Sequence, residues 1–159
     1  MDYIGSECYL QQNKIETINE VLDDFSDYPN FSQVVNTWTD TDIAFSPNVI
    51  AGGQILVRPL KNLELGLYPK FVGEQFLDNF SNENRVLDSY FVSDFLGQFI
   101  IPNNKLKEIS ISLKVNNVFN ALYSANGYTY SFISGDLITE NFLYPQAGTN
   151  FLAGLTIRF

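Results

Sequence analysis

The chain has 159 residues, a length typical of a single domain. Eighteen acidic residues, nine basic residues and no His give a net charge of −9. This argues against a nucleic-acid partner, because phosphate binding needs clustered Lys and Arg. Without His, neither a Cys–His dyad nor a Ser–His triad can form. Cys8 is the only cysteine, and no glycine-rich phosphate loop or calcium-loop motif is present. The composition therefore supports no enzyme, and we predict no catalytic residue, metal ligand or cofactor.

The segment 7–25 is ambiguous. Its apolar residues have helical spacing, at Ile15, Ile18, Val21 and Leu22. The stretch 9–15 could equally begin a strand, but local propensity favours a short helix. The polar and aromatic segment 23–42, which contains Pro29 and Trp38, is predicted to be a long loop.

From Ile43 onward, apolar and polar residues alternate, as they do along strands whose side chains point to opposite faces. The alternating runs lie at 43–58, 63–71, 91–101, 109–116 and 150–159. Two of the connections between runs are short and rich in turn-forming residues, at 59–62 and 102–106. Two others are long and polar, at 77–88 and 121–146. The pattern predicts an all-β fold: an antiparallel up-and-down meander of about six long strands, with the long loops at one end.

The final run favours a membrane setting. Phe151, Ala153, Leu155, Ile157 and Phe159 share one parity, and an apolar strand that reaches the terminus suits a barrel whose last strand closes against another. The basic residues of the predicted strands fall on the polar parity, at Arg58, Lys70, Lys114 and Arg158. Alternating short and long connections, and aromatics at 15% of the chain, are typical of a transmembrane β-barrel. The alternative is a soluble small barrel or sandwich that binds a small ligand.

The two parities predict two faces. The apolar face, towards lipid, would hold Ile109, Ile111, Leu113 and Val115 together with the apolar residues of the final run. The lumen would receive Lys114, Asn116, Asn150 and Arg158.

Residues 1–20 have no basic start and no apolar run of signal-peptide length, and no apolar stretch is long enough for a transmembrane helix. The simple interpretation is a soluble protein. The alternative is that Met1 is not the beginning of the functional protein.

Several motifs resemble the carboxyl-terminal part of TonB-dependent receptors of Gram-negative outer membranes. They are V-N-N-V-F-N at 115–120, S-A-N-G-Y-T-Y at 124–130, and Y-P-Q-A-G at 144–148 before the strand that ends in Phe159; the segments 42–51 and 70–79 are also similar. The resemblance covers the chain from about Tyr9. It implies a strand rather than a helix at 10–15, and it makes Phe159 part of the signal read by the outer-membrane assembly machinery.

By this resemblance, residues 1–159 form a carboxyl-terminal barrel fragment, since the family's barrels have 22 strands and an amino-terminal plug. The expected location is the outer membrane, and the expected role is import of a scarce ligand such as a ferric siderophore, haem or a cofactor. The expected partners are outer-membrane lipid, the remaining barrel strands and plug, and the assembly machinery, with TonB reached only through the missing plug. The fragment is not expected to function alone, and a non-functional gene remnant is an alternative.

Ligand contact in such receptors involves extracellular loops, which here are aromatic and acidic. The candidate ligand-binding residues are Tyr123, Asn126, Tyr128, Tyr130, Asn141 and Tyr144. Aromatic rings offer flat apolar faces to a large ligand, whereas the acidic loops disfavour an anionic ligand unless a metal bridges it. The alternative role for these tyrosines is an aromatic girdle at the membrane boundary.

Overall fold

The computed structural model describes residues 2–103 and 105–159, and in these residues the regular structure is entirely β. The strands are β1 (Tyr3–Leu10), β2 (Lys14–Asp23), β3 (Gln33–Asp42), β4 (Val49–Leu60), β5 (Leu63–Val72), β6 (Gln75–Phe76), β7 (Val86–Leu87), β8 (Tyr90–Ile100), β9 (Glu108–Asn116), β10 (Ser124–Ser134), β11 (Asp136–Pro145) and β12 (Asn150–Arg158). The described part of the chain holds no helix with the length and apolar character needed to cross a bilayer.

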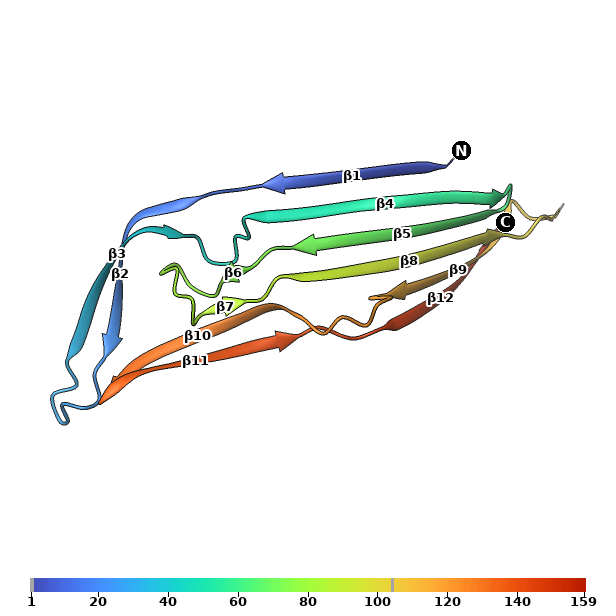
Figure 1. Ribbon diagram of the computed structural model, residues 1–159. Coiled ribbons are helices and arrows are strands. Elements are labelled where there is room, and N and C mark those ends of the chain that lie inside the picture. Colours follow the sequence, from blue (N-terminus) through green and yellow to red (C-terminus); the bar gives the residue numbers. More distant parts are fainter. Residues whose placement is uncertain (1, 104) are drawn as a thin grey trace.

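Six strands form one antiparallel sheet in the order β1-β4-β5-β8-β9-β12. Three two-stranded sheets, β2–β3, β6–β7 and β10–β11, are inserted between β1 and β4, β5 and β8, and β9 and β12. Figure 1 shows all three insertions at one end of the sheet, with the short β4–β5 and β8–β9 connections at the other. The predicted all-β meander is therefore confirmed within the described residues. The sheet is open, and β1 and β12 are its edges.

The helix predicted for 7–25 is wrong. β1 pairs along its whole length with β4, from Tyr3 opposite Leu56 to Leu10 opposite Val49. β2 pairs with β3, and burial along it alternates, so that Glu20 and Leu22 are buried while Val21 is exposed. Hydrogen bonding to distant partner strands outweighs the local preference for a helix. The helical spacing of a few apolar residues therefore gave a wrong prediction. The strand expected at 10–15 is present except at 11–13, which join β1 to β2.

The predicted long loop at 23–42 is also wrong in its second half, where β3 forms a hairpin with β2. The segment 121–146 is likewise a hairpin, since β10 and β11 pair from Ser134 opposite Asp136 to Ser124 opposite Pro145. Conversely, the alternating residues 43–48 are not a strand, because β4 begins at Val49 and Phe45 has a φ of 54°. We call residues 14–48, 73–88 and 117–149, which carry the three insertions, the loop layer.

One face of the six-stranded sheet is continuously apolar. Cross-strand partners in an antiparallel ladder share a face, so the register places these side chains together: Ile55, Val57, Leu65, Leu67, Phe71, Phe91, Phe95, Phe99, Ile109, Ile111, Leu113, Val115, Phe151, Leu155 and Ile157. Many of these side chains are exposed, and Phe151 is 74% exposed. The predicted grouping of the apolar residues of β9 and β12 is confirmed, while Phe159 lies beyond the end of β12.

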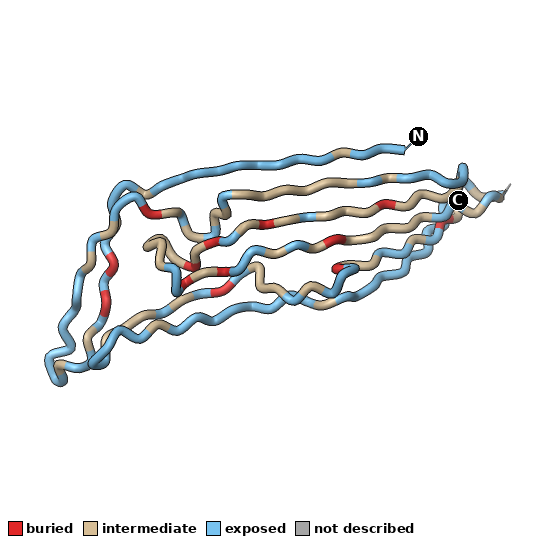
Figure 2. Tube along the Cα trace, in the orientation of Figure 1, coloured by how far each residue is buried: buried red, intermediate tan, exposed pale blue. Residues whose placement is uncertain are grey.

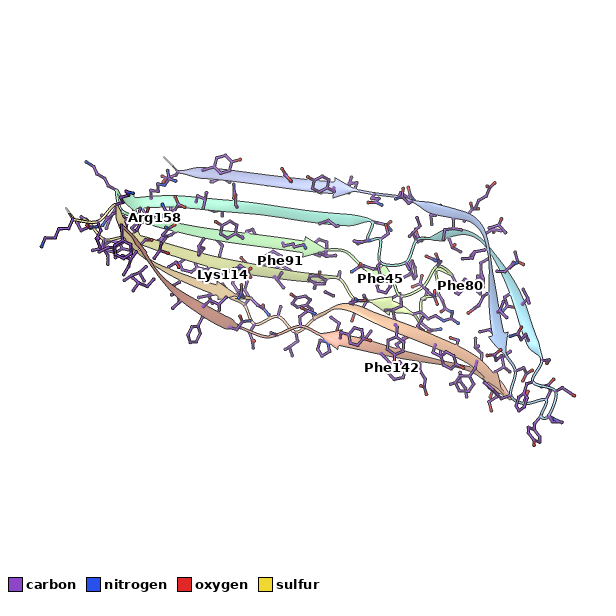
Figure 3. The ribbon with its side chains drawn as sticks, turned by 180° about the vertical axis from the view of Figure 1, so that it is seen from behind. Phe45, Phe80, Phe91, Lys114, Phe142 and Arg158 are labelled. Atoms are coloured by element: carbon purple, nitrogen blue, oxygen red, sulfur yellow. The ribbon has the colours of Figure 1, made fainter. Side chains whose placement is uncertain are left out.

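The opposite face is polar. Lys114 and Asn116 lie on it in register with Leu152 and Asn150. Three ion pairs cross neighbouring strands, Arg58–Glu64 at 2.5 Å, Lys114–Asp94 at 3.5 Å and Arg158–Glu108 at 2.9 Å. The side chains shown in Figure 3 include Lys114 and Arg158 on this sheet. The two parities predicted from the sequence are thus separated onto two faces.

The buried core is small and lies off the middle of the sheet. The buried apolar side chains are Leu22, Val72, Leu77 and Leu87, and Figure 2 shows the buried positions gathering where the sheet meets the loop layer. Apolar burial therefore holds the loop layer onto the end of the sheet, whereas the sheet itself is held mainly by its hydrogen-bond ladders.

Candidate functional site

The loop layer is organised around a buried arginine. Arg85, just before β7, is 2% exposed, and its Nη1 donates to Glu20 Oε1 at 2.6 Å and to Asp78 Oδ2 at 2.8 Å. Glu20 lies on β2 and also accepts a hydrogen bond from Trp38 Nε1 on β3, at 3.0 Å. The Arg85 guanidinium carbon lies 5.9 Å from the centre of the Phe80 ring. One side chain thus joins the β2–β3 hairpin to the segment 73–88.

The neighbours of Arg85 stabilise its charge. Burial alone would lower the pKa of Arg85, but hydrogen bonds and charge interactions with Asp78 and Glu20 outweigh burial, so the pKa is raised. The guanidinium is therefore charged at neutral pH. A buried charge that has two carboxylate partners is held in place, because losing one partner would leave the other charge uncompensated.

The segment 73–88 also bonds to its other neighbours. Ser81 Oγ accepts from the Asp42 backbone N–H at 2.7 Å, and Asn79 Oδ1 accepts from the Ala44 N–H at 2.7 Å. On the opposite side, Asn141 of β11 donates to the backbone carbonyl of Asn84 at 2.6 Å. The three insertions are consequently one connected layer and not three independent loops.

An aromatic ladder covers the outer face of the β10–β11 hairpin. Tyr128 and Phe142 are cross-strand partners whose rings stack at 4.7 Å with an interplanar angle of 12°. Tyr144 lies 6.2 Å from Tyr128, and Tyr130 lies 5.5 Å from Phe132, both between ring centroids. The other face points inward, since a Cβ at Gly127 would lie 3.1 Å from Leu77. We call Tyr128, Tyr130, Phe132, Phe142 and Tyr144 the aromatic ladder; Figure 3 labels Phe142 on this hairpin.

The structure brings together some of the predicted ligand residues and separates others. Tyr128, Tyr130 and Tyr144 belong to the ladder, and Asn126 is in register with Tyr144. Asn126 Oδ1 accepts a bond from the next residue's N–H at 2.8 Å, which is a local turn contact. Asn141 lies on the inward face, where its side-chain amide donates a hydrogen bond to the backbone carbonyl of Asn84. Tyr123 lies outside the ladder, stacked on Tyr90 at 4.3 Å.

Two features escaped the sequence prediction. Phe142 is a full member of the ladder, and its even spacing from Tyr144 would have revealed it once a hairpin, centred on Gly135, was assumed. At the far end, Phe25 packs against Phe31 at 6.0 Å and against Phe132 of β10 at 5.7 Å. The Phe25 N–H also donates to the Ile133 carbonyl at 2.9 Å, so the tips of two hairpins that are distant in sequence touch. No local pattern marks that contact.

Charge is divided unequally between the sheet and the loop layer. The loop layer has thirteen acidic and two basic residues, a net charge of −11, whereas the rest of the chain has five acidic and seven basic residues, a net charge of +2. Both basic residues of the loop layer are paired: Lys14 with Asp42 at 3.1 Å, and Arg85 with Glu20 and Asp78. Among the described residues, no group of three or more His, Cys, Asp or Glu side chains is placed to hold a metal ion.

A hollow lies over the polar face of β1, β4 and β5, with a volume of about 660 Å³. Its polar lining includes Glu7, Gln54, Tyr68, Lys70 and Asp94. It contains both charge signs, from Glu7 and Asp94 on one side and Lys70 on the other.

Comparison with models of known protein families gave no match, and comparison with curated proteins found none that is significantly similar.

Proposed function

We propose that this chain is the carboxyl-terminal part of the barrel of an outer-membrane TonB-dependent receptor, which imports a scarce ligand together with further barrel strands and a plug. The apolar face of the six-stranded sheet carries this proposal. A soluble sheet of this size covers its apolar face with a second layer, whereas a membrane barrel turns that face to lipid.

The strand dimensions support the proposal. β4 has 12 residues and β8 has 11, so a strand rising about 3.3 Å per residue and tilted by about 40° spans roughly 28 Å. The apolar band of an outer-membrane barrel is about 25 Å tall. Strands in soluble sheets are usually only about five or six residues long.

The charge pattern and sheet edges agree with a barrel wall. Arg58, Lys114 and Arg158 lie on the polar face in ion pairs, which is where a lumen would accommodate them. β1 and β12 each have one unpaired side, and each unpaired backbone group in hydrocarbon costs several kcal/mol. Neighbouring strands on both sides would remove that cost. The proposed receptor therefore includes further barrel strands that pair with β1 and β12.

The test is site-directed spin labelling of this chain within the proposed full-length receptor in lipid vesicles, in a Cys8→Ser background. Single cysteines replace Leu113, Lys114, Leu155 and Thr156 in turn. Collision of the nitroxide with oxygen, which concentrates in lipid, should be high at positions 113 and 155. Collision with a water-soluble nickel chelate should be high at 114 and 156.

A matched control uses the loop layer, where a label at exposed Val35 should be accessible to the nickel chelate. Uniform water accessibility at all four sheet positions would overturn the membrane assignment and, with it, the proposed transport role.

A further inference from the structure

We infer that the outer face of the β10–β11 hairpin binds an organic cation, and that the ligand of the proposed receptor is therefore positively charged. This inference rests on the proposed function for its biological setting. Its physical basis is the combination of unpartnered aromatic faces with a surface that is strongly negative.

The aromatic ladder is built for a flat or bulky apolar group. Tyr128, Phe142 and Tyr144 are 48%, 42% and 51% exposed although they contact one another. The other face of the hairpin contacts the segment 73–88, where Gly127 lies against Leu77 and Asn141 donates to the Asn84 carbonyl. The rings are therefore held by a fixed backbone and leave their outer surfaces free.

Carboxylates lie on the same face as the rings. Glu140 is the cross-strand partner of Tyr130, and Asp136 is the partner of Ser134, so both share the outer face of the hairpin. Both are exposed, and neither takes part in an ion pair among the described residues. Aromatic faces carry negative quadrupole potential, which attracts a cation placed over them, and nearby carboxylates add to that attraction.

The charge of the whole layer selects the same class of ligand. With a net charge of −11 and both of its cations paired internally, the loop layer repels an approaching anion and steers a cation. A hydrated inorganic ion gains little from ring faces, whereas an organic cation also buries apolar carbon against them. The occupant that fits is an amine or quaternary ammonium group on an apolar or aromatic body.

The test is ligand-observed NMR on the whole chain in non-ionic detergent micelles, with three probes of similar size. Benzyltrimethylammonium carries the cation, benzyl alcohol is neutral, and benzoate is anionic. We expect the cation to bind with a dissociation constant on the order of millimolar, as small fragments do, and at least about tenfold more tightly than benzoate. Raising the salt concentration should weaken its binding.

Two variants locate the binding. Tyr128→Ala combined with Tyr144→Ala should weaken binding of the cation about tenfold. Glu140→Gln should weaken it about threefold at low salt. Tyr9→Ala is the matched control, because Tyr9 is an exposed tyrosine whose hydroxyl bonds to Glu7 at 2.8 Å on the distant strand β1. It should leave the affinity unchanged.

Equal binding of benzoate or benzyl alcohol to the unaltered protein would overturn the inference, and so would unchanged affinity in both ladder and Glu140 variants. Circular dichroism checks that each variant retains its strands. If the double tyrosine variant fails to fold, the Glu140→Gln variant by itself tests whether this face of the hairpin binds the cation. If this test fails while nitroxide accessibility still alternates between the two faces of the sheet, only the inferred class of ligand is refuted. If the nitroxide accessibility does not alternate, the proposed function itself is refuted.

Discussion

Arg85 Nη1 lies 2.6 Å from Glu20 Oε1, across 65 residues of sequence, and both side chains are almost fully buried. A buried pair of this kind defines where two segments meet, because either charge without the other would be strongly unfavourable. The contact therefore places the β2–β3 hairpin over the segment 73–88. Since that segment also holds Asn141 of β11, the position of the aromatic ladder depends indirectly on the same pair.

The first prediction concerns this cluster. Arg85→Met should destabilise the loop layer by about 3–5 kcal/mol, because the buried Glu20 and the part-buried Asp78 are left without their cation. Trp38 donates to Glu20, so its fluorescence should shift to the red as the hairpin loosens. The matched control is Arg158→Met, whose pair with Glu108 is exposed, with 66% of the arginine accessible; it should cost at most about 1 kcal/mol. Equal effects of the two variants would contradict the central role of Arg85.

The second prediction concerns the two faces of the sheet. Leu155→Arg places a charge on the apolar face, opposite Ile111, and should cost about 2–4 kcal/mol if that face meets the middle of the bilayer. Thr156→Arg, one residue along β12 on the polar face, should be tolerated. The measurement is the fraction of the full-length receptor that stays folded in vesicles as denaturant is increased. Similar midpoints for both variants would refute the orientation.

The third prediction concerns the packing of the ladder hairpin. A Cβ at Gly127 would lie 2.7 Å from the Phe142 carbonyl oxygen and 3.1 Å from Leu77. Backbone cannot yield as a flexible side chain can, so Gly127→Ala should destabilise the hairpin by about 1–3 kcal/mol. Gly97→Ala is the control, because its Cβ would make ordinary contacts, the nearest at 3.5 Å from Phe95. Hydrogen exchange of the β10 and β11 amides should accelerate only in the first variant.

The fourth prediction concerns acid pH at the tip of the β2–β3 hairpin. A side-chain hydrogen bond from Ser32 and the Ser32 backbone N–H, which lies 3.1 and 3.3 Å from the carboxylate oxygens of Asp27, lower the pKa of this carboxyl below its ordinary value of 3.8. The stabilisation is thus complete above that value and is lost as the pH falls through the lowered pKa. An NMR titration should show the Ser32 amide signal moving in that acidic range. In Asp27→Asn the movement should disappear.

The sequence by itself determined the fold class and five of the six strands of the main sheet, all but β1. Alternation of apolar and polar residues is local information, because successive side chains along a strand necessarily face opposite ways. The turn near 59–62, the sequential pairing of β4, β5, β8, β9 and β12, and the shared face of Ile111 with Leu155 could therefore be predicted. The turn predicted at 102–106 includes residue 104, which lies outside the described residues. The clustering of tyrosines at 123–144 could also be predicted, although not which of them share a surface.

Only the tertiary structure decided the arrangement of the loop layer. β2 and β3 exist because each supplies hydrogen-bond partners to the other, and no local pattern in 23–42 records that pairing. The register of β10 with β11 determines that Tyr128 and Phe142 stack while Asn141 turns inward. The bonds from Arg85 to Glu20 and Asp78 join segments far apart in the chain. Such contacts depend on where the connected sheet brings distant residues together, and this is information that residue spacing does not contain.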